Sequence, residues 1–139
     1  MATKFELSTF IKETIQTTGV DVRGSTPLDL LEKATFHHLS GSDPLFWLLP
    51  SDRWGMTIGT KVYVKHFAFW DITGSYQAQK KAAPKVWHEL VHVAQCLDLG
   101  TIGFFADYLW EWILSGFDWR KIDLEEEAFE YEDRFRERM

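Results

Sequence analysis

Apolar residues in the first fifty positions recur at helical spacing in two separate stretches. The first stretch predicts a short amphipathic helix with four apolar residues on one side: Leu7, Phe10, Ile11 and Ile15. Gly19 follows as its stop. A second helix is expected to start after Thr26, a natural N-cap, with Pro27 in its first position. His37 and His38 come after it beside a turn-rich stretch, and we expect them at the surface or in a loop.

The pattern between residues 45 and 84 contains one alternating segment between irregular ones. Residues 45–55 (LFWLLPSDRWG) predict an aromatic loop or a single helical turn. Residues 56–67 (MTIGTKVYVKHF) alternate and are rich in β-branched and aromatic side chains, which predicts a strand from Met56 to Lys65, alone or paired with a neighbour. Residues 70–84 (WDITGSYQAQKKAAP) predict a loop.

The remaining sequence predicts three helices. Pro84 suits the first turn of a helix that runs to about Leu99, where Gly100 ends it. A further helix is expected over about residues 102–115. The last begins at Asp123, which can cap the helix together with Glu126 in a capping box. The order α-α-β-α-α-α indicates a mostly helical α+β fold with a small sheet, in a single domain spanning residues 1–139.

The composition narrows the class of protein. The chain has 15 basic and 21 acidic residues and a net charge of −6, without the Lys and Arg cluster that nucleic-acid binding needs. Cys96 is the single cysteine, so no intramolecular disulfide can form, and we expect a buried free thiol. The N-terminus lacks the apolar segment of a signal peptide, and acidic residues and glycines interrupt the apolar residues 97–117. A cytoplasmic protein is therefore expected.

The segment KVWHELVHVAQC (residues 85–96) contains the side chains that could bind a metal ion and take part in catalysis. His88 and His92 are four positions apart, so both imidazoles lie on one face of a helix and can reach one metal ion. Glu89 is then placed to act as a general base on a water at that ion. The H-E-x-x-H spacing is typical of catalytic zinc sites, which add a third protein ligand and a water, although nickel, cobalt or manganese could occupy a similar site.

A third ligand could come from the acidic run at residues 125–127, on the last predicted helix. A helix and a turn separate this run from the motif, which is enough chain to double back. Acidic runs usually form a solvated helix face. The distance of this run from His92 is what distinguishes it from such a face.

HELVHVAQ, the upstream strand GMTIGTKVYV and the downstream EEEA resemble the gluzincins, zinc metallopeptidases with an H-E-x-x-H helix and a glutamate as third ligand. Within that clan, the segment resembles small bacterial and phage domains of the kind found with contractile injection systems. The resemblance covers about residues 55–130 and implies a zincin-like metal-binding core there, with the motif on a central helix and the third ligand on a C-terminal helix. Residues 1–50 would form a helical N-terminal part.

Carried over by position, the resemblance makes Ala128 the small residue that follows the ligand glutamate by three positions. It thus implies Glu125 as the third zinc ligand, with Glu127 as the second choice. Gln95 matches a glutamine of the family and is expected to support the site through hydrogen bonds.

One position departs from the family pattern, in which an aspartate four residues after the ligand glutamate orients the first histidine. Phe129 stands there in this chain, so a group that the sequence does not identify must serve His88. The resemblance also implies that the strand from Met56 to Lys65 forms a sheet edge that pairs with an extended peptide. The candidates for stabilising the oxyanion are Tyr131, His66 and Tyr108.

Three functions agree with these observations. The first is a zinc-dependent metallopeptidase, a hydrolase acting on peptides or proteins, with Glu89 as general base and His88, His92 and Glu125 as ligands. The second is a non-catalytic, zinc-stabilised domain that binds a partner, for instance in a phage or injection-system-like assembly. The third, a membrane-surface protein that uses its tryptophans, is the least expected. The sequence leaves the oligomeric state open.

Overall fold

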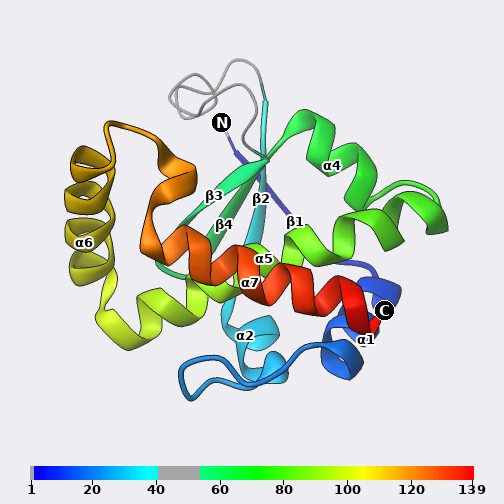
Figure 1. The fold of residues 1–139 in the computed structure, drawn as a ribbon. Coiled ribbons are helices and arrows are strands. Elements are labelled where there is room, and N and C mark those ends of the chain that lie inside the picture. The colour runs from blue at the N-terminus through cyan, green and yellow to red at the C-terminus, as the bar shows by residue number, and fades with distance from the viewer. Residues whose placement is uncertain (1, 41–53) are drawn as a thin grey trace.

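A mixed sheet and six α-helices make up the described part of the chain, residues 2–40 and 54–139 of a computed structural model (Figure 1). The strands are β1 (Thr3–Phe5), β2 (Thr35–Leu39), β3 (Gly55–Ile58) and β4 (Lys61–Lys65). The helices are α1 (Thr9–Thr18), α2 (Pro27–Lys33), α4 (His66–Ile72), α5 (Tyr76–Leu99), α6 (Thr101–Leu114) and α7 (Asp123–Arg138), with a 3-10 turn η1 (Trp119–Lys121). The predicted α+β class, mostly helical with a small sheet, is confirmed.

The sheet has the order β1-β2-β4-β3. β2 and β4 are parallel, while β1 and β3 pair antiparallel with them on the two sides. The strand predicted from Met56 to Lys65 is in fact the hairpin β3-β4. It reverses at Gly59, whose φ of +64° is a conformation that glycine adopts without steric cost. β3 is therefore the last strand on its side of the described sheet.

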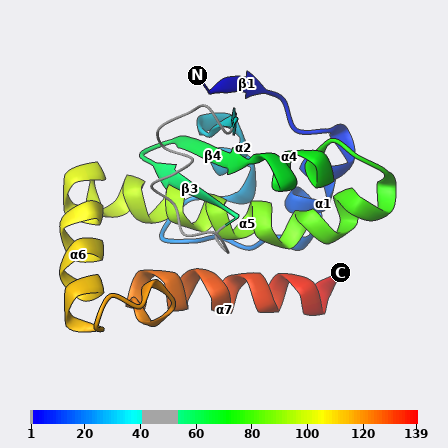
Figure 2. The ribbon, with the colours of Figure 1, turned by 90° about the horizontal axis from the view of Figure 1, so that it is seen from above.

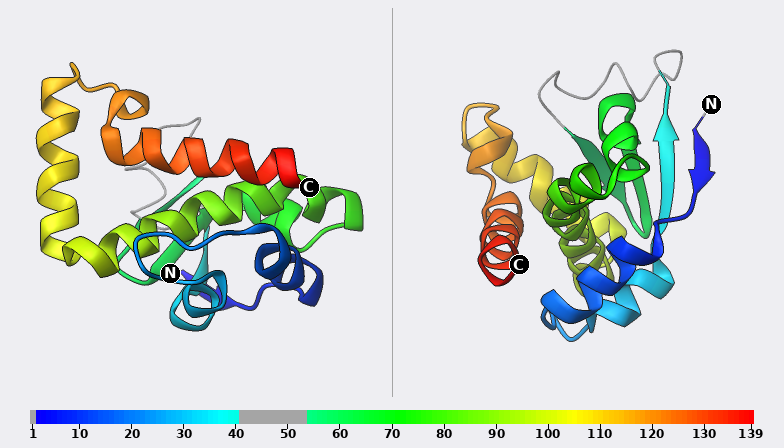
Figure 3. Two further views of the ribbon diagram at one scale, coloured as in Figure 1. Left: turned by 60° about the horizontal axis from the view of Figure 1, so that its bottom comes forward. Right: turned by 90° about the vertical axis from the view of Figure 1, so that its right-hand side faces the viewer.

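α5 is the central helix of the molecule. It lies between the sheet and α7, and α7 runs antiparallel beside it (Figures 2 and 3). Every residue from Ala82 to Cys96 is buried except Lys85. Trp87 is fully buried in the main hydrophobic core, to which α1, α2 and α7 contribute Ile11, Leu30 and Phe135. Because this part of α5 is covered on nearly all sides, its buried polar residues contact other polar groups inside the protein; these residues are His88, Glu89, His92 and Gln95.

α5 begins two turns earlier than predicted. Ser75 caps it by accepting a hydrogen bond from the backbone N–H of Ala78, and Pro84 lies inside the helix. Proline has no N–H and normally breaks a helix. Here the helix continues because Ala82, Ala83 and Pro84 are packed into the interior. The loop predicted over residues 70–84 is accordingly wrong, since α4 and the start of α5 occupy most of it.

His37 and His38 lie in the strand β2 and not in a loop, while their side chains are partly exposed. β2 pairs with β1 on one side and β4 on the other, and these long-range hydrogen bonds outweigh its weak local strand signal. The N-terminal part, predicted to be helical, therefore also supplies two strands of the sheet. The aromatic loop predicted at residues 45–55 falls mainly outside the described residues.

The start of α7 also differs from the prediction. Ile122 occupies the N-cap position and no side chain caps the helix, so the expected capping box of Asp123 and Glu126 does not form. The backbone N–H of Asp123 instead donates to Glu111 Oε2 of α6, 2.7 Å away. Glu125 consequently lies in the first helical turn, where the helix dipole favours a negative charge.

α6 crosses one end of the molecule and connects α5 to α7 (Figures 1 and 2). Its position agrees with the prediction, but Phe104 is its one buried residue. Ile102, Trp110 and Leu114 expose 87%, 63% and 68% of their surface. In the part of the chain that the structure describes, neither α6 nor any other helix has the length and apolar character needed to cross a membrane.

Candidate metal centre

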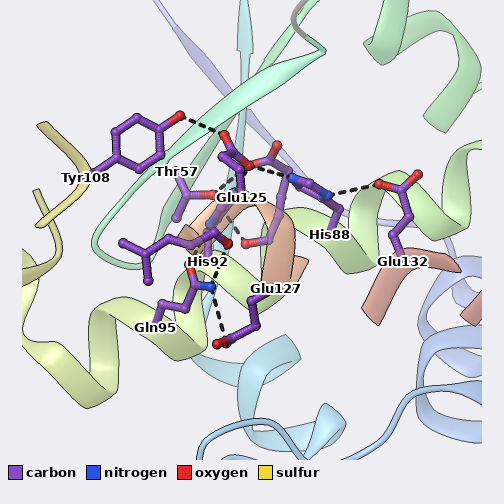
Figure 4. A network of polar contacts seen from close by, with 10 residues as sticks. Thr57, His88, His92, Gln95, Tyr108, Glu125, Glu127 and Glu132 are labelled. Atoms are coloured by element: carbon purple, nitrogen blue, oxygen red, sulfur yellow. Dashed lines mark hydrogen bonds and ion pairs between the residues drawn. The ribbon is translucent and has the colours of Figure 1, made fainter. Parts of the chain in front are cut away.

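His88, His92 and Glu125 meet in the interior, where α7 passes α5 (Figure 4). Glu125 Oε1 lies 3.0 Å from His88 Nε2 and 2.7 Å from His92 Nε2. One possible ligand atom from each residue lies within 4.8 Å of the others. Within residues 2–40 and 54–139, this is the one group of three or more His, Cys, Asp or Glu side chains that could hold a metal ion.

The charges around this group fit a cation. Glu89, Glu125 and Glu132 are all buried, with exposed fractions of 3%, 0% and 5%. Arg136 forms an ion pair with Glu132, which leaves an excess of buried negative charge. Buried charge is costly unless it is neutralised. Two imidazole nitrogens and one carboxylate oxygen form a donor set that suits a transition-metal ion better than calcium or magnesium.

The same surroundings act on the pKa of His88. Burial alone would lower this pKa, but the contacts with Glu125 and Glu132 outweigh burial and raise it to about 9. Burial would likewise raise the pKa of Glu132, yet the contacts with His88 and Arg136 hold it below its ordinary value. The interior at this position thus stabilises positive charge.

Gln95 orients His92, as expected. Its Oε1 lies 2.7 Å from His92 Nδ1, and its Nε2 donates to the carbonyl oxygen of Leu124, 2.9 Å away. The first contact holds the Nδ1 side of the ring, so that Nε2 faces Glu125. The second contact joins α5 to the first turn of α7, and therefore fixes the position of Glu125 relative to both histidines.

Glu132 is the partner of His88 that the sequence did not identify. Its Oε1 lies 2.9 Å from His88 Nδ1, although not in the direction of a straight hydrogen bond. Phe129 packs its ring against His88 with 4.6 Å between ring centroids. Glu132 is seven residues after Glu125 and thus on the same face of α7. This seven-residue spacing is the sequence pattern from which Glu132 could have been predicted.

Glu127, the second choice for the third ligand, lies at the partly exposed edge of the cluster. Arg23 binds it with two hydrogen bonds of 2.9 Å, from Nε and Nη2, and Gln95 Nε2 lies 3.3 Å from its Oε1. The Arg23 guanidinium holds the pKa of Glu127 below its ordinary value. Glu125 is thus the residue of the acidic run that faces the histidines.

Glu89 is held by a residue of the edge strand. Thr57 of β3 donates a hydrogen bond from Oγ1 to Glu89 Oε2, 2.8 Å away, and both side chains are buried. No hydrogen bond to the other carboxylate oxygen, Oε1, occurs among the described residues. Thr57 was not predicted as a site residue, because no local pattern links a strand residue to a side chain 32 positions later.

Tyr108 is the one candidate for oxyanion stabilisation that contacts the cluster. Its hydroxyl donates to Glu125 Oε2 over 2.7 Å. Tyr131 packs against the main hydrophobic core, and His66 Nδ1 lies 2.7 Å from His38 Nε2 on the outside. Cys96 is a buried free thiol, as expected, and burial raises its pKa to about 11.

A hollow of about 190 Å³ reaches the cluster at His88. His88, Glu89 and Glu132 line it on the inside, and Trp54 and Phe129 are among the side chains around it. The cluster is therefore deeply buried but can be approached from one side, beside Glu89. This arrangement can hold a metal ion and present a carboxylate to a molecule in the hollow.

The arrangement of these side chains is the structural observation from which a function can be inferred. Their geometry combines a possible metal ligand set, a carboxylate beside it and an opening to the outside. Comparisons with known protein families, with characterised proteins and with solved structures find no match for this chain.

Proposed function

We propose that this protein is a zinc-dependent metallopeptidase with a zincin-like arrangement of helix and sheet. The observation that supports this most directly is the buried convergence of His88, His92 and Glu125 beside a hollow that His88 and Glu89 line. In this proposal the two histidines and Glu125 bind the zinc ion. Two nitrogen ligands and one oxygen ligand are the set found in catalytic zinc sites that hydrolyse peptides.

Bound zinc would polarise the substrate carbonyl and lower the pKa of a water toward about 7. Glu89 accepts the proton of that water on Oε1 and delivers it to the leaving amine nitrogen. The hydrogen bond from Thr57 to Oε2 keeps the carboxylate in position and leaves Oε1 available to accept a proton. Gln95 and Glu132 hold the rings of His92 and His88, so that both Nε2 atoms face Glu125 and would be available to a zinc ion.

β3 is the segment best placed to bind an extended peptide. It is the last strand on its side of the described sheet, and peptides commonly add to such an edge through main-chain hydrogen bonds. Because Thr57 of β3 contacts Glu89, a peptide along this strand would pass the general base. Tyr108, beside Glu125, is the group we assign to the developing negative charge on the carbonyl oxygen.

The test is hydrolysis of a mixed peptide library by the zinc-loaded protein, followed by mass spectrometry. We expect cleavage at defined bonds, loss of cleavage with a chelator, and recovery when zinc is added back. A protein that carries zinc but cleaves no peptide of the library would contradict the proposal.

That result would favour a non-catalytic, zinc-stabilised binding domain. The exposed apolar side of α6, with Ile102, Trp110 and Leu114, is the observation in its favour. In such a domain zinc raises the melting temperature, whereas Glu89 can be replaced without consequence.

Replacing Glu132 tests whether this residue positions His88. Glu132→Gln removes the charge that faces His88 Nδ1, and loss of such a partner typically lowers metal affinity by about 10–100-fold. Zinc affinity is measured by competition with a chromogenic chelator. Glu130→Gln, an exposed change on the same helix, is the matched control and should leave the affinity unchanged. Equal affinities for both variants would rule out this role.

A further inference from the structure

A second and larger hollow adjoins the candidate active site. It is a groove of about 800 Å³, within the size range of ligand-binding sites. Trp54 and Lys85 border both the groove and the hollow at the metal cluster, so the two are neighbours. Trp54 and Phe67 give the groove apolar walls.

The groove is positively charged in a chain whose net charge is −6. Lys80, Lys81, Lys85 and Arg136 line it, against the single acidic residue Asp71. Arg136 is already paired with glutamate and aspartate on its own helix. Within the described residues the three lysines form no ion pair, and all three are exposed. Unpaired like charges around one groove repel one another, and a bound anion relieves that repulsion.

Two of these lysines lie on the same side of α5 as the metal-binding histidines. Lys81, Lys85, His88 and His92 follow one another at spacings of four, three and four residues, which form one stripe along a helix. At 1.5 Å per residue, Lys81 lies about 10 Å along the axis from His88. An extended peptide advances about 3.3 Å per residue, so this distance corresponds to about three residues of substrate.

We propose that the groove is a specificity subsite for a peptide with an acidic side chain about three residues from the scissile bond. Lys81 and Lys85 bind the aspartate or glutamate carboxylate, while Trp54 and Phe67 contact neighbouring apolar side chains of the peptide. The inference depends on the proposed peptidase function, because it assumes that the peptide in the groove continues to a scissile bond beside Glu89.

Binding is measured separately from hydrolysis, with the zinc-loaded Glu89→Gln protein. The probes are fluorescent peptides with blocked ends and the same apolar residues, which carry aspartate, asparagine or lysine about three residues from the intended scissile bond. We expect aspartate peptides to bind about tenfold more tightly than asparagine peptides, the effect of about two exposed ion pairs. Added salt should reduce the difference.

The variant that tests the lysines is Lys81→Glu with Lys85→Glu, made in the same background. It should reverse the preference, so that lysine peptides bind best. Lys12→Glu with Lys33→Glu changes the net charge equally on α1 and α2, and should keep the preference for aspartate. If the double reversal lowers the melting temperature, Lys81→Gln with Lys85→Gln should abolish the preference without reversing it.

The outcomes separate this inference from the proposed function. Equal binding of aspartate and lysine peptides, or an equal loss in the Lys12 and Lys33 control, would overturn the subsite. Charge-dependent binding by Glu89→Gln without any hydrolysis by the parent would keep the subsite and refute the peptidase. Hydrolysis by the parent with no preference for acidic peptides would support the peptidase and refute the subsite.

Discussion

Replacing Glu89 with glutamine is expected to lower the rate of peptide hydrolysis by about 10²–10⁴-fold, the usual contribution of a general base. Glutamine has nearly the same shape, and its carbonyl oxygen can still accept the hydrogen bond from Thr57. It cannot accept a proton from water at neutral pH. Zinc content and melting temperature should therefore stay close to those of the parent, and the loss should appear in kcat.

The matched control for this experiment is Glu32→Gln, which makes the same chemical change on the exposed surface of α2. It should leave the rate unchanged. A Glu89→Gln protein as active as the parent would show that another group accepts the proton. Since Glu132 is the other carboxylate in the hollow, Glu132→Gln would then be assayed for the same loss.

The second large effect is expected on zinc content. The parent should carry close to one zinc ion per chain, whereas His92→Ala and Glu125→Gln should lose it on dialysis. Both residues are buried and face each other across 2.7 Å, so the removal of either leaves a gap in the ligand set. The fall in affinity should exceed the roughly 10–100-fold that follows loss of a ligand's hydrogen-bond partner.

Glu127→Gln is the control that separates the two glutamates. It changes a carboxylate that Arg23 binds at the edge of the cluster, so zinc content should stay at the parent level. Elemental analysis gives the stoichiometry, and calorimetry gives the stabilisation by zinc, because a ligand that binds the folded state raises the melting temperature. Zinc retained by Glu125→Gln and lost by Glu127→Gln would reverse the assignment. A parent protein that folds and binds no zinc would refute the metal centre.

Local patterns were sufficient for some parts of this protein. His88 and His92 share a face of α5 because four residues make about one helical turn, and this holds wherever the helix lies. Thr26 caps α2 and Pro27 occupies its first turn because both belong to the start of the same helix. Such features depend on neighbours in the sequence, so the sequence alone predicts them.

Features that combine distant segments were not predictable in this way. Pro84 stays inside α5 because that turn is buried, and the histidines of β2 lie in a sheet because strands from both sides pair with them. Local propensity differs by about 1 kcal/mol or less between most residues, and proline inside a helix costs about 3 kcal/mol. Burial of several side chains can exceed both.

The residues of the site also fall into those that the sequence predicted and those that only the structure identified. Spacing on one helix determined His88, Glu89 and His92, and the resemblance to gluzincins singled out Glu125 from the sequence alone. Tertiary structure alone decided that Arg23 draws Glu127 to the edge of the cluster, that Thr57 holds Glu89, and that Glu132 stands beside His88. The physical reason is that each of these contacts joins two elements whose relative position depends on packing of the whole core around α5, which no local pattern encodes.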